Sequence, residues 1–370
     1  MPRALLVGDF GRPEPGAQAL LEVFARSLPS RWTPVVTSEN PASTERRHGV
    51  EAVRPPSTRD VSRQVRSVDA LVMAGGSPLD SMMVPGSEAD RSRVIGPLSM
   101  ASRLLSKPVA AVGVGADTLP SRASRALARG LVRRADLLVL RDEVSAESLA
   151  TAGASAPFRV GSDPTWALLD RPLSPVTQAS DSVTVVVQQT DGPFDADFLA
   201  TGLQPVERGG LRVRIQPWLA TDNGGDDVSL ARNLADRLAN AVVLESPANL
   251  VEARDSLAES RVVLGMPFHA LLAAASAGSR FVALSSTPGT RGLAHRFEQP
   301  ALGPDSAPER LAEAVLAAAT GPRPNPATVR SEIASAEEGF RLLRLLLNGG
   351  AGDDVDEITG LPLRPVPWAQ

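Results

Sequence analysis

Short apolar runs alternate with longer amphipathic segments along almost the whole chain. This pattern is typical of parallel β-sheets covered by helices, in which each strand is buried on both faces and each helix on one. The runs predict strands at residues 4–9, 34–37, 69–76, 108–115, 136–142, 158–164, 183–189, 211–217, 241–246, 261–265 and 281–286. Helices are predicted at residues 16–28, 59–67, 89–105, 120–134, 143–152, 227–239, 248–259, 267–277, 307–319 and 326–347.

The alternation is interrupted by the Pro- and Ser-rich stretch 170–182 and then begins again. A chain of 370 residues is long for one domain and suits two. We therefore predict an α/β protein with two Rossmann-like domains, whose parallel sheets face each other across a cleft. The predicted order is an N-terminal domain at 1–170, a linker at 171–182, a C-terminal domain with a terminal helix at 183–348, and a loosely ordered tail at 349–370.

The composition argues against several classes of function. The net charge of −4 gives no reason to expect nucleic acid or an anionic membrane as a partner. The chain has no cysteine and only three widely spaced histidines, so disulfides, thiolate catalysis and a zinc site are not expected. The first apolar run is too short for a signal peptide, and no run approaches the ~20 residues of a membrane span. We expect a cytoplasmic protein that is not integral to a membrane.

Glycine-bearing turns end two of the predicted strands of the first domain. Gly75 and Gly76 precede Ser77 at the end of one run, and Gly113 and Gly115 close the next. Glycine lets the backbone approach a ligand closely and adopt positive φ. Strand–helix turns in any α/β protein also need glycine, so each turn has a purely structural alternative. Neither turn matches the dinucleotide or P-loop fingerprint.

Two charged side chains stand at predicted strand ends. Arg141 could grip a carboxylate or phosphate with its planar fork, or it could form a salt bridge with Asp142 or another acid. Asp163, which precedes Pro164, could accept a hydrogen bond from a sugar hydroxyl, or it could cap the following turn. The residues alone leave both pairs of alternatives open.

His269 stands at the start of a predicted helix that opens at Pro267, directly after the apolar run 261–265. A helix N-terminus offers unpaired N–H groups and a partial positive charge, so it is a natural seat for an anion. Proline suits the first helical position. The alternative is a core histidine bonded to a backbone carbonyl. His295 falls in a polar helix and is expected at the surface, and His48 falls in a charged loop and gives no functional signal.

In this order, the motifs resemble the polysaccharide pyruvyl transferase family over about residues 4–300. The resemblance is carried by Ala74–Ser77, Gly113–Gly115, Leu140–Ser145 with Leu149–Gly153, Ser162–Pro164, and Gly265–Ala270 with Ser285 behind it. It implies two Rossmann-like domains arranged as in GT-B glycosyltransferases. It also implies transfer of pyruvate from phosphoenolpyruvate onto two hydroxyls of a sugar as a cyclic ketal, in the biosynthesis of cell-envelope polysaccharide.

The resemblance makes His269, Arg141 and Asp163 the candidate catalytic residues. The candidate donor-binding residues are Gly75, Gly76, Ser77, Gly115, Met266, Ser285 and Arg291. A protonated His269 would act as the general acid on the methylene carbon of the donor. Arg141, Arg291 and the helix N-terminus would meet the donor's negative charge, and Asp163 would orient the sugar or accept its hydroxyl proton. The scheme requires no metal and no cofactor.

Three family motifs are altered in this chain. The family's GMRLHA has an arginine where Pro267 stands, and the acids of its GNxGDE correspond to Ala17 and Gln18. Its SYDPK is replaced by a segment with Thr290 and Arg291, of which Arg291 could supply a displaced positive charge. Two alternatives therefore stay open. One is a GT-B-type glycosyltransferase with a nucleotide-sugar donor, for which Glu245 is a candidate carboxylate. The other is a binding or scaffold protein without activity.

Overall fold

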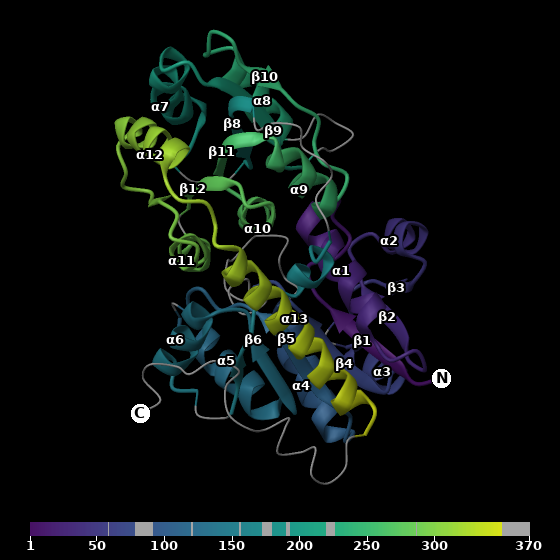
Figure 1. Ribbon diagram of the computed structural model, residues 1–370. Coiled ribbons are helices and arrows are strands. Elements are labelled where there is room, and N and C mark those ends of the chain that lie inside the picture. Colours follow the sequence, from purple (N-terminus) through teal and green to yellow (C-terminus); the bar gives the residue numbers. More distant parts are fainter. Residues whose placement is uncertain are drawn as a thin grey trace. The chain divides into compact units, whose positions relative to one another are not determined.

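The computed structural model describes residues 1–57, 59–77, 92–119, 121–154, 157–171, 180–189, 193–219, 226–285 and 287–349. The chain forms two compact units (Figure 1). The first comprises Met1–Arg12, Ala17–Ala167 and the chain from Glu332 onward, and the second comprises Pro13–Gly16 and Leu168–Ser331. Within the described residues, each unit contains one sheet.

In the described part of the first unit, seven parallel strands form a sheet in the order β3-β2-β1-β4-β5-β6-β7. Their bounds are β1 Arg3–Val7, β2 Thr33–Thr37, β3 Glu51–Val53, β4 Ala70–Ala74, β5 Val109–Val114, β6 Leu137–Leu140 and β7 Arg159–Val160. The chain moves outward from β1 to β3 and then returns to β4 on the other side of β1. Ligands of open α/β sheets collect at such a reversal, outside the carboxyl ends of the strands.

Helices cover both faces of the first sheet. Their bounds are α1 Pro15–Ser27, α2 Pro41–His48, α3 Val61–Arg66, α4 Ser92–Leu104, α5 Arg122–Arg134, α6 Glu143–Thr151, a 3₁₀ helix at Pro164–Leu168, and α13 Pro326–Leu347. Ala111 of β5 lies in one core cluster with Leu98 of α4 and Leu131 of α5. The next residue, Val112, lies against Gly339 of α13. Because successive side chains of a strand point to opposite faces, α4 and α5 cover one face and α13 the other, in front of the strands in Figure 1.

In the described part of the second unit, six parallel strands form a sheet in the order β10-β9-β8-β11-β12-β13. Their bounds are β8 Ser180–Val187, β9 Arg212–Pro217, β10 Val242–Val243, β11 Ser260–Gly265, β12 Arg280–Leu284 and β13 Ala301–Leu302. The helices are α7 Ala196–Arg208, α8 Asp226–Ala235, α9 Leu250–Ala258, α10 Phe268–Ser276, α11 Pro288–Arg296 and α12 Pro308–Thr320. The strand order again reverses, here between β8 and β11.

The predicted fold class, two Rossmann-like units built on parallel sheets, is confirmed. Five elements lie outside the predicted ranges: α2, α7, α11 and the short strands β3 and β13. Helix α7 contains Gly202 and Pro205, which lower helix propensity. The glycine has a packing reason, because a Cβ at Gly202 would lie 2.8 Å from the Cβ of Leu311 on α12. The strand predicted at 158–164 is shorter, because Pro164 begins a 3₁₀ helix.

The unit boundaries differ from the predicted domains in several places. Pro13–Gly16 and residues 168–170, predicted in the N-terminal domain, belong to the second unit. Most of α13 belongs to the first unit, where Phe340 packs edge-to-face on Phe24 of α1 with ring centroids 5.0 Å apart. Strand β8 starts at Ser180, within the predicted linker. Residues 172–179 of that linker and the tail from 350 onward lie outside the described residues.

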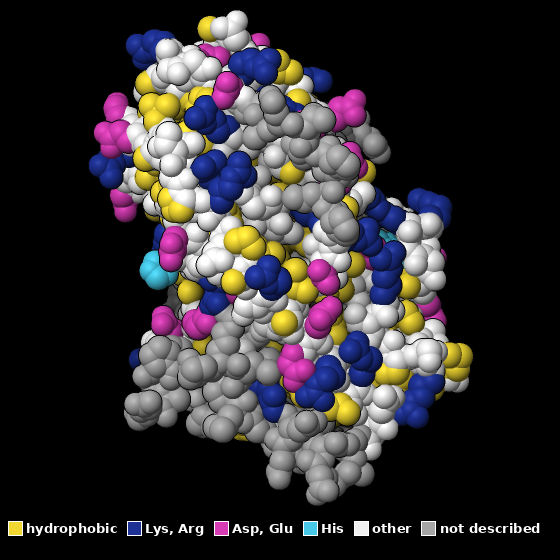
Figure 2. Space-filling view, in the orientation of Figure 1, with side chains coloured by type: hydrophobic (Ala, Val, Ile, Leu, Met, Phe, Trp, Pro, Cys, Tyr) yellow, Lys and Arg dark blue, Asp and Glu magenta, His cyan; other side chains and the backbone are white. Residues whose placement is uncertain are grey.

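Two surface properties bear on possible partners. Acidic and basic side chains are interspersed on the face of the molecule that Figure 2 shows. In the described residues, no helix has both the length and the apolar character needed to cross a bilayer.

Candidate functional site

In the first unit, the predicted site residues lie after four neighbouring strands. Gly75–Ser77 follow β4, Gly115 follows β5, Arg141 follows β6 and Asp163 lies beyond β7. The carboxyl ends of parallel strands meet at one edge of a sheet, so the topology brings these residues together. A backbone hydrogen bond of 2.6 Å from Gly115 N to Gly76 O joins the first two turns.

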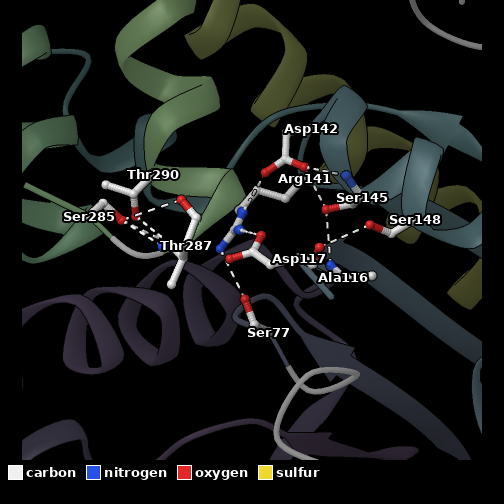
Figure 3. A network of polar contacts seen from close by, with 10 residues as sticks. All are labelled: Ser77, Ala116, Asp117, Arg141, Asp142, Ser145, Ser148, Ser285, Thr287 and Thr290. Atoms are coloured by element: carbon white, nitrogen blue, oxygen red, sulfur yellow. Dashed lines mark hydrogen bonds and ion pairs between the residues drawn. The ribbon is translucent and has the colours of Figure 1, made fainter. Parts of the chain in front are cut away.

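Arg141 is the centre of this edge and is only 7% exposed. Its Nε donates to Asp142 Oδ2 at 2.9 Å, its Nη2 to Asp117 Oδ1 at 3.1 Å and its Nη1 to Ser77 Oγ at 3.3 Å (Figure 3). The salt-bridge alternative for Arg141 is therefore realised. Burial alone would lower the pKa of Arg141, but the charges of Asp142, Asp117 and Asp163 raise it above its ordinary value, so the guanidinium is always charged.

Gly115 leaves the space that the Arg141 side chain occupies. A Cβ at Gly115 would lie 2.9 Å from Arg141 Nη2 and 2.8 Å from Ser77 Oγ, which is too close for a carbon atom. Glycine is needed at positions 75 and 76 for a different reason. Gly75 and Gly76 adopt φ of 64° and 69°, a left-handed conformation that other residues rarely adopt. These glycines therefore shape the edge whether or not they touch a donor.

Asp117 was missed by the sequence reasoning. It follows β5 in a turn without any motif, and only the fold brings it to Arg141. A carboxylate two residues after a glycine turn at a strand end could have been considered as a partner for a strand-end arginine.

Asp163 is 2% exposed, and its Oδ1 accepts hydrogen bonds from the backbone N of Thr165 at 2.9 Å and from Thr165 Oγ1 at 2.6 Å. It therefore caps the 3₁₀ helix Pro164–Leu168, as the structural alternative supposed. Its carboxylate also adds negative charge near Arg141. A role for Asp163 toward a sugar hydroxyl stays a prediction.

Asp142 is the N-cap of α6 and has a lowered pKa. Burial alone would raise the pKa, but the Arg141 guanidinium and hydrogen bonds from Ser145 and Arg141 hold it below the ordinary value. Ser145 donates to Asp142 Oδ1 from its backbone N at 2.8 Å and from its hydroxyl at 2.5 Å. The charged carboxylate thus accepts hydrogen bonds from the first turn of α6 and from the Arg141 guanidinium at the same time.

We expect Asp142→Asn to make the free energy of unfolding fall less steeply at acid pH. A carboxyl with a lower pKa in the folded state contributes stability that is complete above its unfolded pKa of about 3.9 and is lost as the pH falls through the folded value. The free energy of unfolding in urea, measured at intervals from pH 6 to pH 2.5, should therefore fall less steeply below pH 4 in the variant. Asp60→Asn, a partly exposed carboxyl, is the control. Equal slopes for Asp142→Asn and the wild type would contradict the prediction.

In the second unit, the predicted residues lie after the neighbouring strands β11 and β12. Helices α10 and α11 begin here, so two helix N-termini reach the same edge of the sheet. Helix α10 begins at Phe268, one residue later than predicted, with Pro267 as a cap that makes no side-chain hydrogen bond. His269 is therefore the second residue of the helix, and its side chain is 16% exposed.

Glu14 faces His269 and was not predicted from the sequence. Its Oε1 lies 4.0 Å from His269 Nδ1 and accepts hydrogen bonds from Trp218 Nε1 at 2.5 Å and from Gly16 N at 2.9 Å. A Cβ at Gly16 would lie 2.0 Å from His269 Nδ1, so only glycine fits there. The altered N-terminal motif, which lacks acids at Ala17 and Gln18, thus places a carboxylate beside the histidine from Glu14. The glutamate just before Pro15 and Gly16 was the available signal.

Hydroxyl groups line the start of α11. Ser285 Oγ accepts from Thr287 N at 2.9 Å, and Thr287 Oγ1 donates to Thr290 Oγ1 at 2.9 Å, as the separate group in Figure 3 shows. Arg291 Nη1 donates to the backbone O of Ser285 at 3.2 Å, so its guanidinium stays at the start of the helix. Ser285 and Arg291 are thus brought together.

Met266 and Glu245 give weaker support to their predicted roles. The N of Met266 donates to Val186 O at 3.2 Å, and its side chain packs against the core of the second unit. Donor binding by Met266 stays a prediction. Glu245 is exposed beyond the short edge strand β10. In the described part of the chain, no three His, Asp or Glu side chains gather closely enough to hold a metal ion.

A family model described as polysaccharide pyruvyl transferase matches residues 15–288. The chain belongs to the polysaccharide pyruvyl transferase family. The match covers the altered histidine motif and ends at the start of α11. This is a family of transferases, which supports an enzymatic role for this pyruvyl transferase family member. No curated protein is significantly similar to it in sequence.

Solved structures with a similar fold are distant in sequence. A putative UDP-N-acetylglucosamine 2-epimerase from Listeria monocytogenes has a TM-score of 0.64 at 12% identity, with 94% of this chain and 97% of the other covered. The Methanocaldococcus jannaschii UDP-GlcNAc 2-epimerase in complex with UDP-GlcNAc and UDP has a TM-score of 0.62 at 12% identity, with 94% of this chain and 100% of the other covered. Anabaena HepE in complex with UDP and glucose has a TM-score of 0.62 at 12% identity, with 95% of this chain and 99% of the other covered. These likenesses establish the fold alone.

Proposed function

We propose that the chain transfers pyruvate from phosphoenolpyruvate onto two hydroxyls of a sugar in a glycan or glycan precursor, in the cytoplasm, and forms a cyclic ketal. The observation that carries the proposal is the place of His269. It lies at the N-terminus of α10, and a carboxylate stands 4.0 Å from its Nδ1. A histidine in this position can combine anion binding with proton transfer.

The donor's phosphate and carboxylate require fixed N–H groups and cations. In the proposal, the N-termini of α10 and α11 and the Arg291 guanidinium supply them from the second unit. Arg141 is already paired with Asp117 and Asp142, and donor binding by Arg141 stays a prediction.

The reaction needs one proton for the donor and releases one from each acceptor hydroxyl. Protonated His269 gives its proton to the methylene carbon, and the adjacent carbon becomes cationic and is attacked by the first hydroxyl oxygen. The C–O bond to phosphate then breaks, and the second hydroxyl adds at the same carbon. Phosphate and the ketal are the products. Of the two hydroxyl protons, one leaves with phosphate and one restores His269. No metal enters the scheme.

Glu14 is proposed to hold the ring of His269 in place. The carboxylate is itself fixed by the Trp218 and Gly16 N–H groups, so it offers a stationary partner for an imidazolium. The family motif has an arginine where Pro267 stands, so His269 is the one residue of Gly265–Ala270 that can carry a positive charge. The pairing with Glu14 gives this chain its own way of placing that charge.

A ligand screen by thermal shift tests the proposal directly. Phosphoenolpyruvate at about 100 times its Kd is expected to stabilise the protein by about 2.7 kcal/mol, which appears as a clear rise in Tm. UDP and UDP-glucose are the comparison ligands, and inorganic phosphate controls for general anion binding. A rise with the nucleotides alone would favour a glycosyltransferase. No rise with any of them would favour a binding or scaffold protein.

A further inference from the structure

We propose that the outer face of α4 and α5 is a docking surface for an anionic lipid bilayer. The surface, here called the α4–α5 patch, comprises Met100, Leu104 and Leu105 together with Arg133 and Arg134. The inference does not depend on pyruvyl transfer. It rests on local charge, on exposed aliphatic side chains and on a rigid turn that displays them.

The local charge is opposite to that of the whole chain. From Ser92 to Asp136 the sequence contains seven arginines and one lysine but only two aspartates, a net charge of +6 in a chain whose total is −4. Helix α5 contains five arginines and no acidic residue. Of the two aspartates, Asp117 is bound to Arg141 and Asp136 to Arg103. The net charge of the whole chain gave no reason to expect an anionic membrane as a partner, because acidic residues elsewhere outweigh the positive charge of this segment.

Exposed aliphatic side chains gather in the same place. Met100, Leu104 and Leu105 are 50%, 79% and 41% exposed, and they make up half of the large hydrophobic side chains that are exposed in the described residues. Single exposed apolar residues are ordinary, but a group of them marks an interaction surface.

The two helices bring these groups side by side. Near their beginnings, a Cβ at Gly96 of α4 would lie 3.1 Å from Leu127 of α5. At their ends, Arg103 of α4 is paired with Asp136, which follows α5. Leu104 and Leu105 therefore lie at the same end of the helix pair as Arg133, which is exposed, and Arg134.

The turn that displays the leucines is fixed rather than loose. Ser106 has a φ of 53°, an unusual conformation for a residue other than glycine. Lys107 closes the turn, because its Nζ donates to the backbone O of Val65 at 2.7 Å and also to that of Val68. The leucines are thus held outward. The Lys107 ammonium is used in hydrogen bonds within the protein, so we do not count it among the membrane-binding cations.

This combination fits a bilayer better than a nucleic acid. Nucleic acids are bound through phosphate contacts to cations, and the leucines would have no function there. At a membrane surface, arginines meet anionic head groups while aliphatic side chains enter the boundary of the acyl chains.

Vesicle co-sedimentation of the full chain tests the proposal. The wild type is expected to bind vesicles of phosphatidylcholine and phosphatidylglycerol (7:3), to bind vesicles of phosphatidylcholine alone much less, and to be released by 0.5 M NaCl. Arg133→Gln/Arg134→Gln should weaken binding on the order of 25-fold, about fivefold for each charge. Leu104→Ser/Leu105→Ser should weaken binding while leaving the salt dependence in place.

The matched control is Arg212→Gln/Arg232→Gln, which removes two exposed arginines of the second unit and should bind like the wild type. Circular dichroism melting checks that each variant is folded, and because all the altered side chains are exposed or half-buried, Tm should change little. Equal binding to neutral and anionic vesicles, an equal loss in the control, or sedimentation without vesicles would overturn the proposal. Binding of a single-stranded RNA oligonucleotide in preference to the anionic vesicles would overturn it as well.

Discussion

Arg141→Met is expected to destabilise the first unit by about 3–5 kcal/mol, the usual cost of removing one partner from a buried ion pair. Methionine fills a similar volume but leaves the carboxylates of Asp117 and Asp142 without their cation. These side chains are only 12% and 18% exposed, so water cannot fully replace the guanidinium. Urea unfolding followed by circular dichroism measures the change.

Two further variants separate charge from shape at this site. Arg141→Lys keeps the charge, but an ammonium cannot reproduce the planar fork that reaches Asp117, Asp142 and Ser77 together, so an intermediate loss is expected. Asp142→Asn in the Arg141→Met background removes one of the stranded charges and should recover part of the stability. Arg212→Met, at an exposed position, should change stability by less than about 0.5 kcal/mol. Arg141→Met with the same unfolding midpoint as the wild type would show that the cluster does not stabilise the fold.

The fold and the general location of the site could be predicted from the sequence because both are local properties of the chain. Buried strands of a parallel sheet are continuous apolar runs, and the polar residues that follow them must lie at one edge. This reasoning placed Arg141 and Asp163 at the edge of the first sheet and His269 at the edge of the second, as the structure does, while their roles stay predictions. It failed at α7, where Gly202 argued against a helix, because the close approach of α12 that requires the glycine is a tertiary contact.

Asp142, adjacent in sequence, was offered as a partner of Arg141 and is one, but Glu14 could not be predicted as the partner of His269 because the two residues lie far apart in the sequence. Glu14 precedes α1, whereas His269 is the second residue of α10, and no motif in either segment specifies the other. The same holds for α13. Its amphipathic pattern predicts a buried stripe, but only the structure shows that the stripe containing Gly339 and Phe340 packs in the first unit.

His269→Ala is expected to lower the kcat of pyruvyl transfer by about 10²–10⁴, the usual contribution of a general acid. The loss should be in kcat, while stabilisation by phosphoenolpyruvate in the thermal shift assay is largely kept, because the helix N-termini and Arg291 would still bind the anion. Product ketal and released phosphate are measured with a panel of hexosyl and N-acetylhexosaminyl glycosides as acceptors. His295→Ala is the matched control, since it removes an exposed histidine of α11.

Glu14→Gln tests whether the carboxylate acts through the histidine. Glutamine keeps an oxygen that can accept the Trp218 and Gly16 hydrogen bonds, so the fold and Tm should be preserved while the charge beside His269 is removed. We expect kcat to fall about tenfold with little change in KM for phosphoenolpyruvate. In the His269→Ala background the same change should have almost no further effect, because residues that act as a unit are not additive. Full transfer by His269→Ala would refute the acid assignment, and additive losses in the double variant would separate Glu14 from the histidine.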